Sequence, residues 1–251
     1  MADNRIVLVT GANQGVGFQV AKELAADGDT VLVGARDLGK GEAAAQRIGA
    51  GATAVQLDVT DTVSIAAAAA RIGRAFGRLD VLVNNAAISN TRKADMSLAG
   101  FAEISRPSVV ALDEVRAIWE TNVFGVLAVY QAMLPLLRAS PAARIVNVSS
   151  GVGSLARNAD PAFHYRQMFM PGYSASKAAL NAMTLTMMIE LEGSSIKVNL
   201  VSPGFTSTNL NGYEGTESLE DGSREVVRVA RFRPDAPTGT FTGTEGAPIP
   251  W

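Results

Sequence analysis

The stretch VTGANQGVG, residues 9–17, joins an apolar run to an amphipathic segment through three glycines. The run before it, residues 5–10, is short and almost continuously apolar, as buried parallel strands are. After it, Val16, Val20 and Leu24 recur at four-residue spacing, which indicates a helix. A glycine turn between a strand and a helix lets the backbone approach a phosphate, and the helix N-terminus supplies N–H donors. The stretch therefore predicts a dinucleotide site, with a plain glycine-rich turn as the alternative. It does not match the Walker-A pattern of nucleotide-binding loops, because no Gly-Lys-Ser/Thr follows.

The alternation of apolar runs with amphipathic stretches continues through most of the chain. Further strands are expected at 30–36, 53–59, 79–87, 143–150, 196–204 and 238–243, and helices at 41–49, 62–76, 111–138, 173–191 and 219–232. Crossovers of helical length predict an α/β fold whose parallel sheet is covered on both faces. No linker or repeat divides residues 1–251, so one domain is expected. The stretches 88–110 and 151–171 lack periodicity and, with 205–222, are expected to form the substrate loops.

Composition and charge narrow the class of protein. The 251 residues include 47% hydrophobic residues and carry a formal net charge of −2 without a basic run, so nothing indicates nucleic-acid binding. No apolar stretch approaches the ~20 residues of a membrane-spanning helix, and residues 1–10 do not resemble a signal peptide. The chain has no cysteine, which excludes disulfides and thiolate ligands. The single histidine, His164, is interpreted as structural or exposed, no metal site is expected, and a cytoplasmic location is favoured.

Tyr173 and Lys177 stand four residues apart in a stretch with helical character. Positions i and i+4 meet on one face of a helix. A free tyrosine has a pKa of about 10, and a nearby ammonium favours the phenolate and lowers that pKa. The pair therefore predicts a tyrosine tuned to exchange a proton with a substrate. The alternative is an ordinary packed tyrosine beside a solvated lysine.

The end of the second strand, GARDLGK, bears on the choice of dinucleotide. An acidic residue at the strand tip suits the unphosphorylated ribose of NAD, whereas a basic residue suits the 2′-phosphate of NADP. Arg36 comes first, Asp37 follows, and Lys40 lies four residues on. We interpret Arg36 as the phosphate partner. If the strand tip lay one residue later, Asp37 would favour NAD instead.

Seven short motifs occur in order along the chain. They are TGANQGVG (10–17), LDV (57–59), NNAA (84–87), TNVFG (121–125), VSS (148–150), YSASK (173–177) and SPGF (202–205). In order and spacing they resemble the motifs of the short-chain dehydrogenases/reductases. Arg36, a longer segment before Tyr173 and the C-terminal tail are most similar to the carbonyl-reductase-like branch. The resemblance implies a single Rossmann-type domain, with a doubly wound sheet of seven parallel strands.

The resemblance also implies a catalytic set of Asn122, Ser150, Tyr173 and Lys177. Tyr173 would exchange a proton with the carbonyl oxygen, Ser150 would hydrogen-bond that oxygen, and Lys177 would also bind the nicotinamide ribose. Asn122 would hold a water that links Lys177 to solvent. Ser150 aligns better than Ser149, and strand alternation would point the two serines to opposite faces.

The residues expected to bind NADPH or NADP+ lie in the same motifs. They are Gly11, Asn13, Gln14, Gly15, Val16, Gly17, Arg36, Lys40, Asp58, Val59, Asn85, Ala86, Ala87, Tyr173, Lys177, Pro203, Gly204, Thr206 and Thr208. Two features depart from the family pattern. Ala87 replaces a glycine near the cofactor, where its methyl group could shift the nicotinamide ribose. Ser150 and Tyr173 are also farther apart than in most members, which implies about ten extra residues in the wall of the substrate pocket.

These features predict an NADPH-dependent reductase of ketones or aldehydes, reversible to alcohol oxidation. Two alternatives stay open: an NAD-dependent alcohol or sugar dehydrogenase, and a non-catalytic NADP-binding regulator. The intact catalytic set disfavours the regulator. The expected partner is a small carbonyl or alcohol substrate, with neither nucleic acid nor a membrane. A monomer or weak homodimer is expected, and light scattering would test this.

Overall fold

The computed structural model describes residues 4–91 and 98–251. Within these residues, one parallel sheet holds seven strands in the order β3-β2-β1-β4-β5-β6-β7. The strands are β1 (Ile6–Thr10), β2 (Thr30–Ala35), β3 (Ala52–Gln56), β4 (Val81–Asn84), β5 (Arg144–Val148), β6 (Lys197–Val201) and β7 (Phe241–Thr242). The order in which strands are added to the sheet reverses between β1 and β4, and ligands of open α/β sheets bind at the carboxyl ends of strands at such a point. The predicted Rossmann-type domain with a doubly wound, seven-stranded parallel sheet is confirmed.

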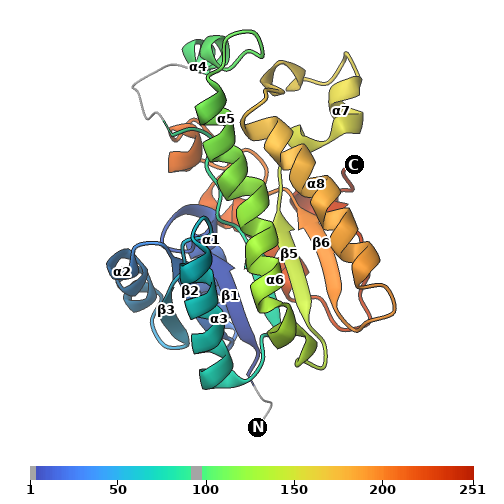
Figure 1. Ribbon diagram of the computed structural model, residues 1–251. Helices are drawn as coiled ribbons and strands as arrows, with labels where there is room; N and C mark the ends of the chain where they lie inside the picture. Colours follow the sequence, from blue (N-terminus) through green and yellow to red (C-terminus); the bar gives the residue numbers. More distant parts are fainter. Residues whose placement is uncertain (1–3, 92–97) are drawn as a thin grey trace.

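Two layers of helices cover the sheet (Figure 1). One layer contains α3 (Thr62–Phe76), α5 (Leu112–Trp119), α6 (Gly125–Arg138) and α8 (Tyr173–Glu190), and the other contains α1 (Gly15–Ala26), α2 (Leu38–Ile48) and α9 (Leu219–Ala230). Alternate strand residues divide between the layers. Leu8 and Leu82 pack with the first layer, and Val9 and Val83 with the second. Burial of both sheet faces explains why the strand sequences are apolar without alternation.

The longest helical run joins α5 and α6 through a π-helical turn, Glu120–Phe124. The run Leu112–Arg138 is long and apolar enough to cross a membrane by length and composition, whereas the sequence alone led us to expect no such stretch. Its inner side lies in the domain core, where Met133 and Leu137 are fully buried. We therefore assign the run as a core helix. Its π turn contains Asn122, and such turns often mark functional positions.

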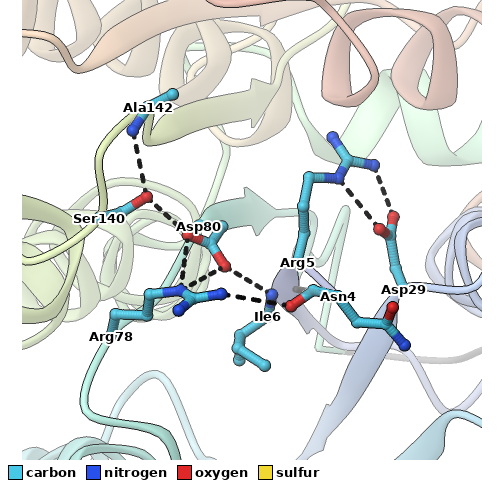
Figure 2. Close-up of polar contacts among 8 residues, drawn as sticks. All are labelled: Asn4, Arg5, Ile6, Asp29, Arg78, Asp80, Ser140 and Ala142. Atoms are coloured by element: carbon cyan, nitrogen blue, oxygen red, sulfur yellow. Dashed lines mark hydrogen bonds and ion pairs between the residues drawn. The ribbon is translucent and has the colours of Figure 1, made fainter. Parts of the chain in front are cut away.

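Polar side chains join the loops at the amino ends of the strands, at the edge opposite the glycine turn (Figure 2). Asp80 accepts hydrogen bonds from the backbone N–H of Ile6 at 2.8 Å and from the Ser140 hydroxyl at 2.6 Å. Arg5 donates to Asp29 at 3.0 Å. These residues lie at or just before the starts of β1, β2, β4 and β5. The cluster therefore fixes the relative positions of four strand starts, and we assign it a structural role.

The stretches that lack periodicity contain short helices. α4 (Leu98–Ile104) lies within 88–110, and α7 (Leu155–Ala159) lies within 151–171 beside two 3-10 turns. Figure 1 shows α4 and α7 beyond the carboxyl ends of the strands. Residues 92–97 of the first stretch lie outside the described residues. β4 also ends earlier than predicted, because the N–H of Asn85 bonds back to the Val83 carbonyl and turns the chain away.

Candidate active site

The glycine turn enters α1 with a backbone shape that suits a phosphate. Gly11 and Gly15 have φ of 63° and 60°, in the left-handed region that glycine adopts without strain. Gln14 is the N-cap of α1, yet its side chain makes no capping hydrogen bond, and the first turn carries no acidic residue. Asn13 and Val16, on either side, are partly exposed. The first N–H groups of α1 therefore have no side-chain cap, and these residues fit the pyrophosphate of a dinucleotide.

Thr10 connects the glycine turn to the segment after β4, a role that the motif alone did not reveal. Its hydroxyl accepts hydrogen bonds from the backbone N–H groups of Asn85 and Ala86, both at 3.0 Å. The Asn85 side chain donates to the Thr10 carbonyl at 2.9 Å. Gly17 is required beside them, because a Cβ there would lie 2.3 Å from the Asn85 amide nitrogen. The signal that could have identified Thr10 is a polar residue that ends an apolar strand directly before a glycine.

Ala87 stands where the family pattern has glycine. Its φ is not in the left-handed region, which only Tyr213 and Glu245 occupy among the described non-glycine residues. The close approach occurs instead at Gly11, where a Cβ would lie 2.9 Å from the Cα of Ala86. The methyl group of Ala87 therefore causes no backbone strain.

The end of β2 separates the roles of Arg36 and Asp37. β2 ends at Ala35, so Arg36 is the first residue beyond the strand, and its side chain is exposed. Asp37 is the N-cap of α2, and its carboxylate accepts a hydrogen bond from the N–H of Lys40 at 3.0 Å. The Lys40 side chain is exposed on the first turn of the helix. Asp37 therefore has a local structural role, while Arg36 has no carboxylate partner in the part of the chain that the structure describes.

Asp58 and Val59 follow β3, next to the end of β2. The Asp58 carboxylate accepts hydrogen bonds from the N–H and the hydroxyl of Thr60, at 2.9 and 2.8 Å. A Cβ on Gly125 would lie 2.7 Å from the Val59 carbonyl, so α6 approaches this turn closely only because residue 125 is glycine. Both residues lie at the carboxyl edge of the sheet, and their expected contact with adenine stays a prediction.

Two hydroxyl groups meet at the carboxyl end of β5. Tyr173 is the first residue of α8, and Ser150 lies close enough to its phenol to act on the pKa of Tyr173 in the lowering direction. Ser149 points the other way, since it is buried and its hydroxyl donates to Asn181. The alternation of strand side chains thus places Ser150, and not Ser149, beside the tyrosine.

Lys177 lies one turn along α8 from Tyr173. Its ammonium nitrogen is 5.7 Å from the centre of the Tyr173 ring and donates a 2.8 Å hydrogen bond to the Val148 carbonyl. Only 2% of its surface is exposed. The end of β5 therefore lies beside both groups: the Val148 carbonyl accepts from Lys177, and Ser150, just beyond the strand, lies beside Tyr173.

Asn122 joins the long helical run to two other parts of the site. Its side-chain amide donates to the Ile88 carbonyl at 2.9 Å and to the Ser176 hydroxyl at 3.0 Å, and its carbonyl oxygen accepts from the Ile88 N–H at 2.9 Å. The residue is fully buried. Asn122 therefore ties the segment after β4 to α8, next to Lys177. Both side-chain N–H groups of Asn122 are already used in these hydrogen bonds. The water expected at Asn122 would therefore have to donate a hydrogen bond to one of its oxygen atoms.

Burial sets the protonation of the tyrosine–lysine pair in the polypeptide. It raises the pKa of Tyr173 to about 12, although the Ser150 hydrogen bond acts in the lowering direction. Burial also lowers the pKa of Lys177 to about 7. The prediction of a lowered tyrosine pKa is therefore wrong for the polypeptide, because burial outweighs the lowering effect of Ser150. Tyr173 is protonated at neutral pH, which is the state that a proton donor needs.

The segment after β6 lies over the glycine turn. A Cβ on Gly15 would be 3.7 Å from the Thr208 methyl group, an ordinary contact distance. Gly204 has a φ of 76°, in the left-handed region. Thr206 is turned inward and buried, and its hydroxyl donates to the Pro203 carbonyl at 2.8 Å. Thr208 is therefore better placed than Thr206 to face a bound dinucleotide.

Glu217 is a further residue at this site that the motifs did not indicate. Its carboxylate lies against Gly204, where a Cβ would be 2.0 Å from Oε2, and Oε2 has no hydrogen-bond partner among the described residues. Burial first, and the nearby Asp221 carboxylate second, raise the pKa of Glu217, while a hydrogen bond from Phe205 N–H acts in the opposite direction. A carboxyl whose folded pKa is raised contributes stability below its unfolded pKa, and that contribution is lost as the pH rises through the folded value.

We expect Glu217→Gln to raise the melting temperature at pH 8 by roughly 1–3 °C, because the neutral amide avoids the cost of the partly screened charge. At pH 4, which is below the ordinary glutamate pKa of 4.5, the difference in melting temperature between Glu217→Gln and wild type should shrink. Thermal unfolding at both pH values measures this. Glu214→Gln, on the exposed part of the same loop, is the matched control. Equal melting temperatures for wild type and Glu217→Gln at pH 8 would contradict the argument.

Comparison with known proteins adds independent information on this arrangement. Residues 5–218 match the family model described as short chain dehydrogenase. The short-chain dehydrogenase anuI of Penicillium roqueforti is 38% identical over 234 residues, covering 90% of this chain and 88% of that protein. Salutaridine reductase of Papaver bracteatum is 30% identical, and the match covers 94% of this chain and 93% of that protein.

The same similarity extends to three dimensions. The solved structure of salutaridine reductase from Papaver somniferum has a TM-score of 0.80 at 29% identity, covering 95% of this chain and 99% of that chain. The family match spans the glycine turn, Ser150, Tyr173 and Lys177. The chain therefore belongs to the short-chain dehydrogenase family, whose members are oxidoreductases that bind nicotinamide cofactors.

Proposed function

We propose that the protein is a cytoplasmic, NADPH-dependent reductase of ketones or aldehydes, reversible to alcohol oxidation. The observation that carries the proposal is the arrangement at β5. The phenol of Tyr173, whose pKa burial raises to about 12, lies beside Ser150 and one turn from the buried Lys177. A neutral phenol beside a second hydroxyl suits proton donation to a carbonyl oxygen that becomes an alkoxide. NADPH, when bound, supplies the hydride.

The residues of the chain would divide the remaining work. Tyr173 donates the proton, and Ser150 holds the same substrate oxygen through a hydrogen bond. Lys177 binds the nicotinamide ribose and acts on Tyr173 electrostatically, while Asn122 fixes the turn of α8 that carries Lys177 through Ser176. This set is complete, which favours an enzyme over a regulator that only binds the dinucleotide.

Other residues of the chain would hold the dinucleotide. The N–H groups of the glycine turn and the first turn of α1 suit the pyrophosphate, and Asp58 and Val59 suit the adenine. Pro203, Gly204 and Thr208 suit the nicotinamide end. The relatives support reduction as the direction, since two of the proteins compared above are named salutaridine reductase.

Cofactor preference depends on Arg36. We expect Arg36→Asp to erase or invert the preference for NADPH, because a carboxylate would replace the guanidinium that pairs with the 2′-phosphate. Loss of a hydrogen bond to a charged group corresponds to roughly a 10- to 150-fold change. The ratio of kcat/KM for NADPH to that for NADH measures it, with Asp37→Asn as a control for the adjacent helix cap. An unchanged ratio in Arg36→Asp would show that Arg36 does not read the phosphate.

One screen tests the proposal as a whole. Purified protein is mixed with NADPH or NADH and with aldehydes, diketones, quinones and cyclic ketones, and cofactor consumption is followed. Carbonyl-dependent consumption of NADPH supports the proposal. Consumption of NADH alone would instead favour the NAD-dependent dehydrogenase, and NADPH binding without turnover would favour the regulator.

A further inference from the structure

Arg157 places a positive charge next to the proposed catalytic serine. It belongs to α7, in the segment between Ser150 and Tyr173. One guanidinium nitrogen, Nη1, lies 3.2 Å from the position that a Cβ on Gly151 would occupy. Gly151 directly follows Ser150, and adjacent Cα atoms are about 3.8 Å apart. The guanidinium thus fills the side-chain space of the residue beside Ser150.

Three segments of the carboxyl edge surround this guanidinium. Ser202, at the end of β6, has its hydroxyl 3.8 Å from the same Cβ position and accepts a hydrogen bond from the Gly151 N–H at 3.0 Å. Phe163, in the loop before α8, has its ring centre 6.0 Å from the guanidinium carbon. The charge therefore lies between the segments that follow β5 and β6 and the loop that leads to Tyr173.

The guanidinium of Arg157 lacks an anionic partner within residues 4–91 and 98–251. Its backbone N–H bonds to the Ser154 hydroxyl, but the side chain makes no hydrogen bond or ion pair with a described residue. Asp160, three residues on, uses one carboxylate oxygen for the N–H of Ala162. By contrast, Arg5, which is also partly buried, has an ion pair with Asp29. A partly buried guanidinium without an anionic partner keeps its N–H donors available to an anionic ligand.

We infer that Arg157 binds a carboxylate of the substrate, so that the substrate class is the oxo acids: ketones or aldehydes with a carboxylate a few bonds from the carbonyl. The inference rests on the proposed reductase function and narrows it. The planar guanidinium matches a carboxylate through two parallel N–H···O bonds. With the carbonyl oxygen at Ser150 and Tyr173, the carboxylate lies on the side of Gly151. Arg157 is then a specificity-determining residue.

The test compares charged and neutral forms of one substrate. With NADPH, kcat/KM is measured for 4-oxopentanoate and 5-oxohexanoate and for their methyl esters. Of the two oxo acids, the one with the higher kcat/KM is compared with its own methyl ester. For wild type, kcat/KM is expected to be at least ~10-fold higher for the acid than for this ester. Arg157→Met is expected to lower kcat/KM for the acid by roughly 10- to 100-fold, because it removes a hydrogen bond to a charged group, and to change that for the ester less than ~3-fold. Arg157→Lys should retain part of the preference.

Controls separate recognition from structure. Arg116→Met, exposed on α5, makes the same change in net charge outside the segment between Ser150 and Tyr173 and should keep the preference. Equal losses for acid and ester in Arg157→Met, or no preference in wild type, would overturn the inference while leaving the reductase proposal intact. Calorimetric binding of pentanoate against pentanamide to wild type and Arg157→Met gives a readout without turnover. If no carbonyl is reduced, the reductase proposal fails. In that case, pentanoate that binds wild type more tightly than pentanamide does, with the difference lost in Arg157→Met, still supports an anion site at Arg157. Equal binding of pentanoate and pentanamide to wild type overturns the anion site.

Discussion

Replacement of Tyr173 by phenylalanine is expected to lower carbonyl reduction by at least ~100-fold, the lower end of what one positioned acid contributes. Phenylalanine keeps the ring that lies 5.7 Å from the Lys177 ammonium and removes only the hydroxyl beside Ser150. Packing at the start of α8 is therefore retained. NADPH affinity should also survive, because the pyrophosphate and 2′-phosphate contacts lie at the other end of the dinucleotide.

The experiment measures NADPH oxidation and, separately, NADPH binding by fluorescence. Tyr165→Phe is the matched control, because Tyr165 belongs to the loop before α8, is 45% exposed, and packs against His164 and Phe205. It should keep at least half of the wild-type rate. If folded Tyr173→Phe reduced carbonyls at a near-native rate, the assignment of the acid would be wrong, and Tyr165 would be the next tyrosine to replace.

The raised pKa of Tyr173 also favours one direction of the reaction. A phenol with a pKa of about 12 is protonated at neutral pH and can donate its proton during reduction. Alcohol oxidation needs the deprotonated tyrosine, whose fraction grows as the pH rises toward that value. The polypeptide is therefore arranged for reduction at neutral pH, in agreement with the direction proposed above.

The fold was predictable where periodicity is strong. The run 62–76 matches α3 residue for residue, and Asp61 caps it, as a helix start should be capped. α7 was missed because a helix of five residues has no periodicity to detect. Its position depends on the C-terminal residues instead, since the Ala156 N–H donates to the Trp251 carbonyl at 3.0 Å. Such contacts between distant segments leave no local pattern.

The site was predictable where one motif carries its own geometry. The spacing of Tyr173 and Lys177 and the choice of Ser150 over Ser149 both follow from local periodicity. Glu217 and Arg157 were missed, because their importance arises only when other segments fold beside them. The sign of the Tyr173 pKa shift was wrong for a related reason: the depth of burial is a property of the folded chain.

Lys177→Met is expected to make the protein more stable at pH 6 and nearly inactive. Burial lowers the pKa of Lys177 from 10.5 to about 7, so the folded state resists protonation that the unfolded state accepts. A depressed pKa gives stability that is present above the unfolded value and is lost as the pH falls to the folded value. At pH 6 the wild type therefore bears the whole cost of a charged, buried ammonium, and methionine removes it.

The loss of the hydrogen bond to the Val148 carbonyl offsets part of this gain by about 1 kcal/mol, so a net gain of roughly 1–3 kcal/mol is expected at pH 6. At pH 10.5 the stability advantage of the variant should vanish or reverse.

The activity of Lys177→Met should fall by at least ~100-fold, with a lower kcat and a higher KM for NADPH, because Lys177 serves both Tyr173 and the ribose. Denaturant unfolding at the two pH values and steady-state kinetics measure these effects, with the exposed Lys22→Met as control. A variant less stable than wild type at pH 6 would mean that the Val148 hydrogen bond outweighs the desolvation of the ammonium. A more stable but inactive variant would show that a cation is kept in the core for its chemistry, at a cost to stability.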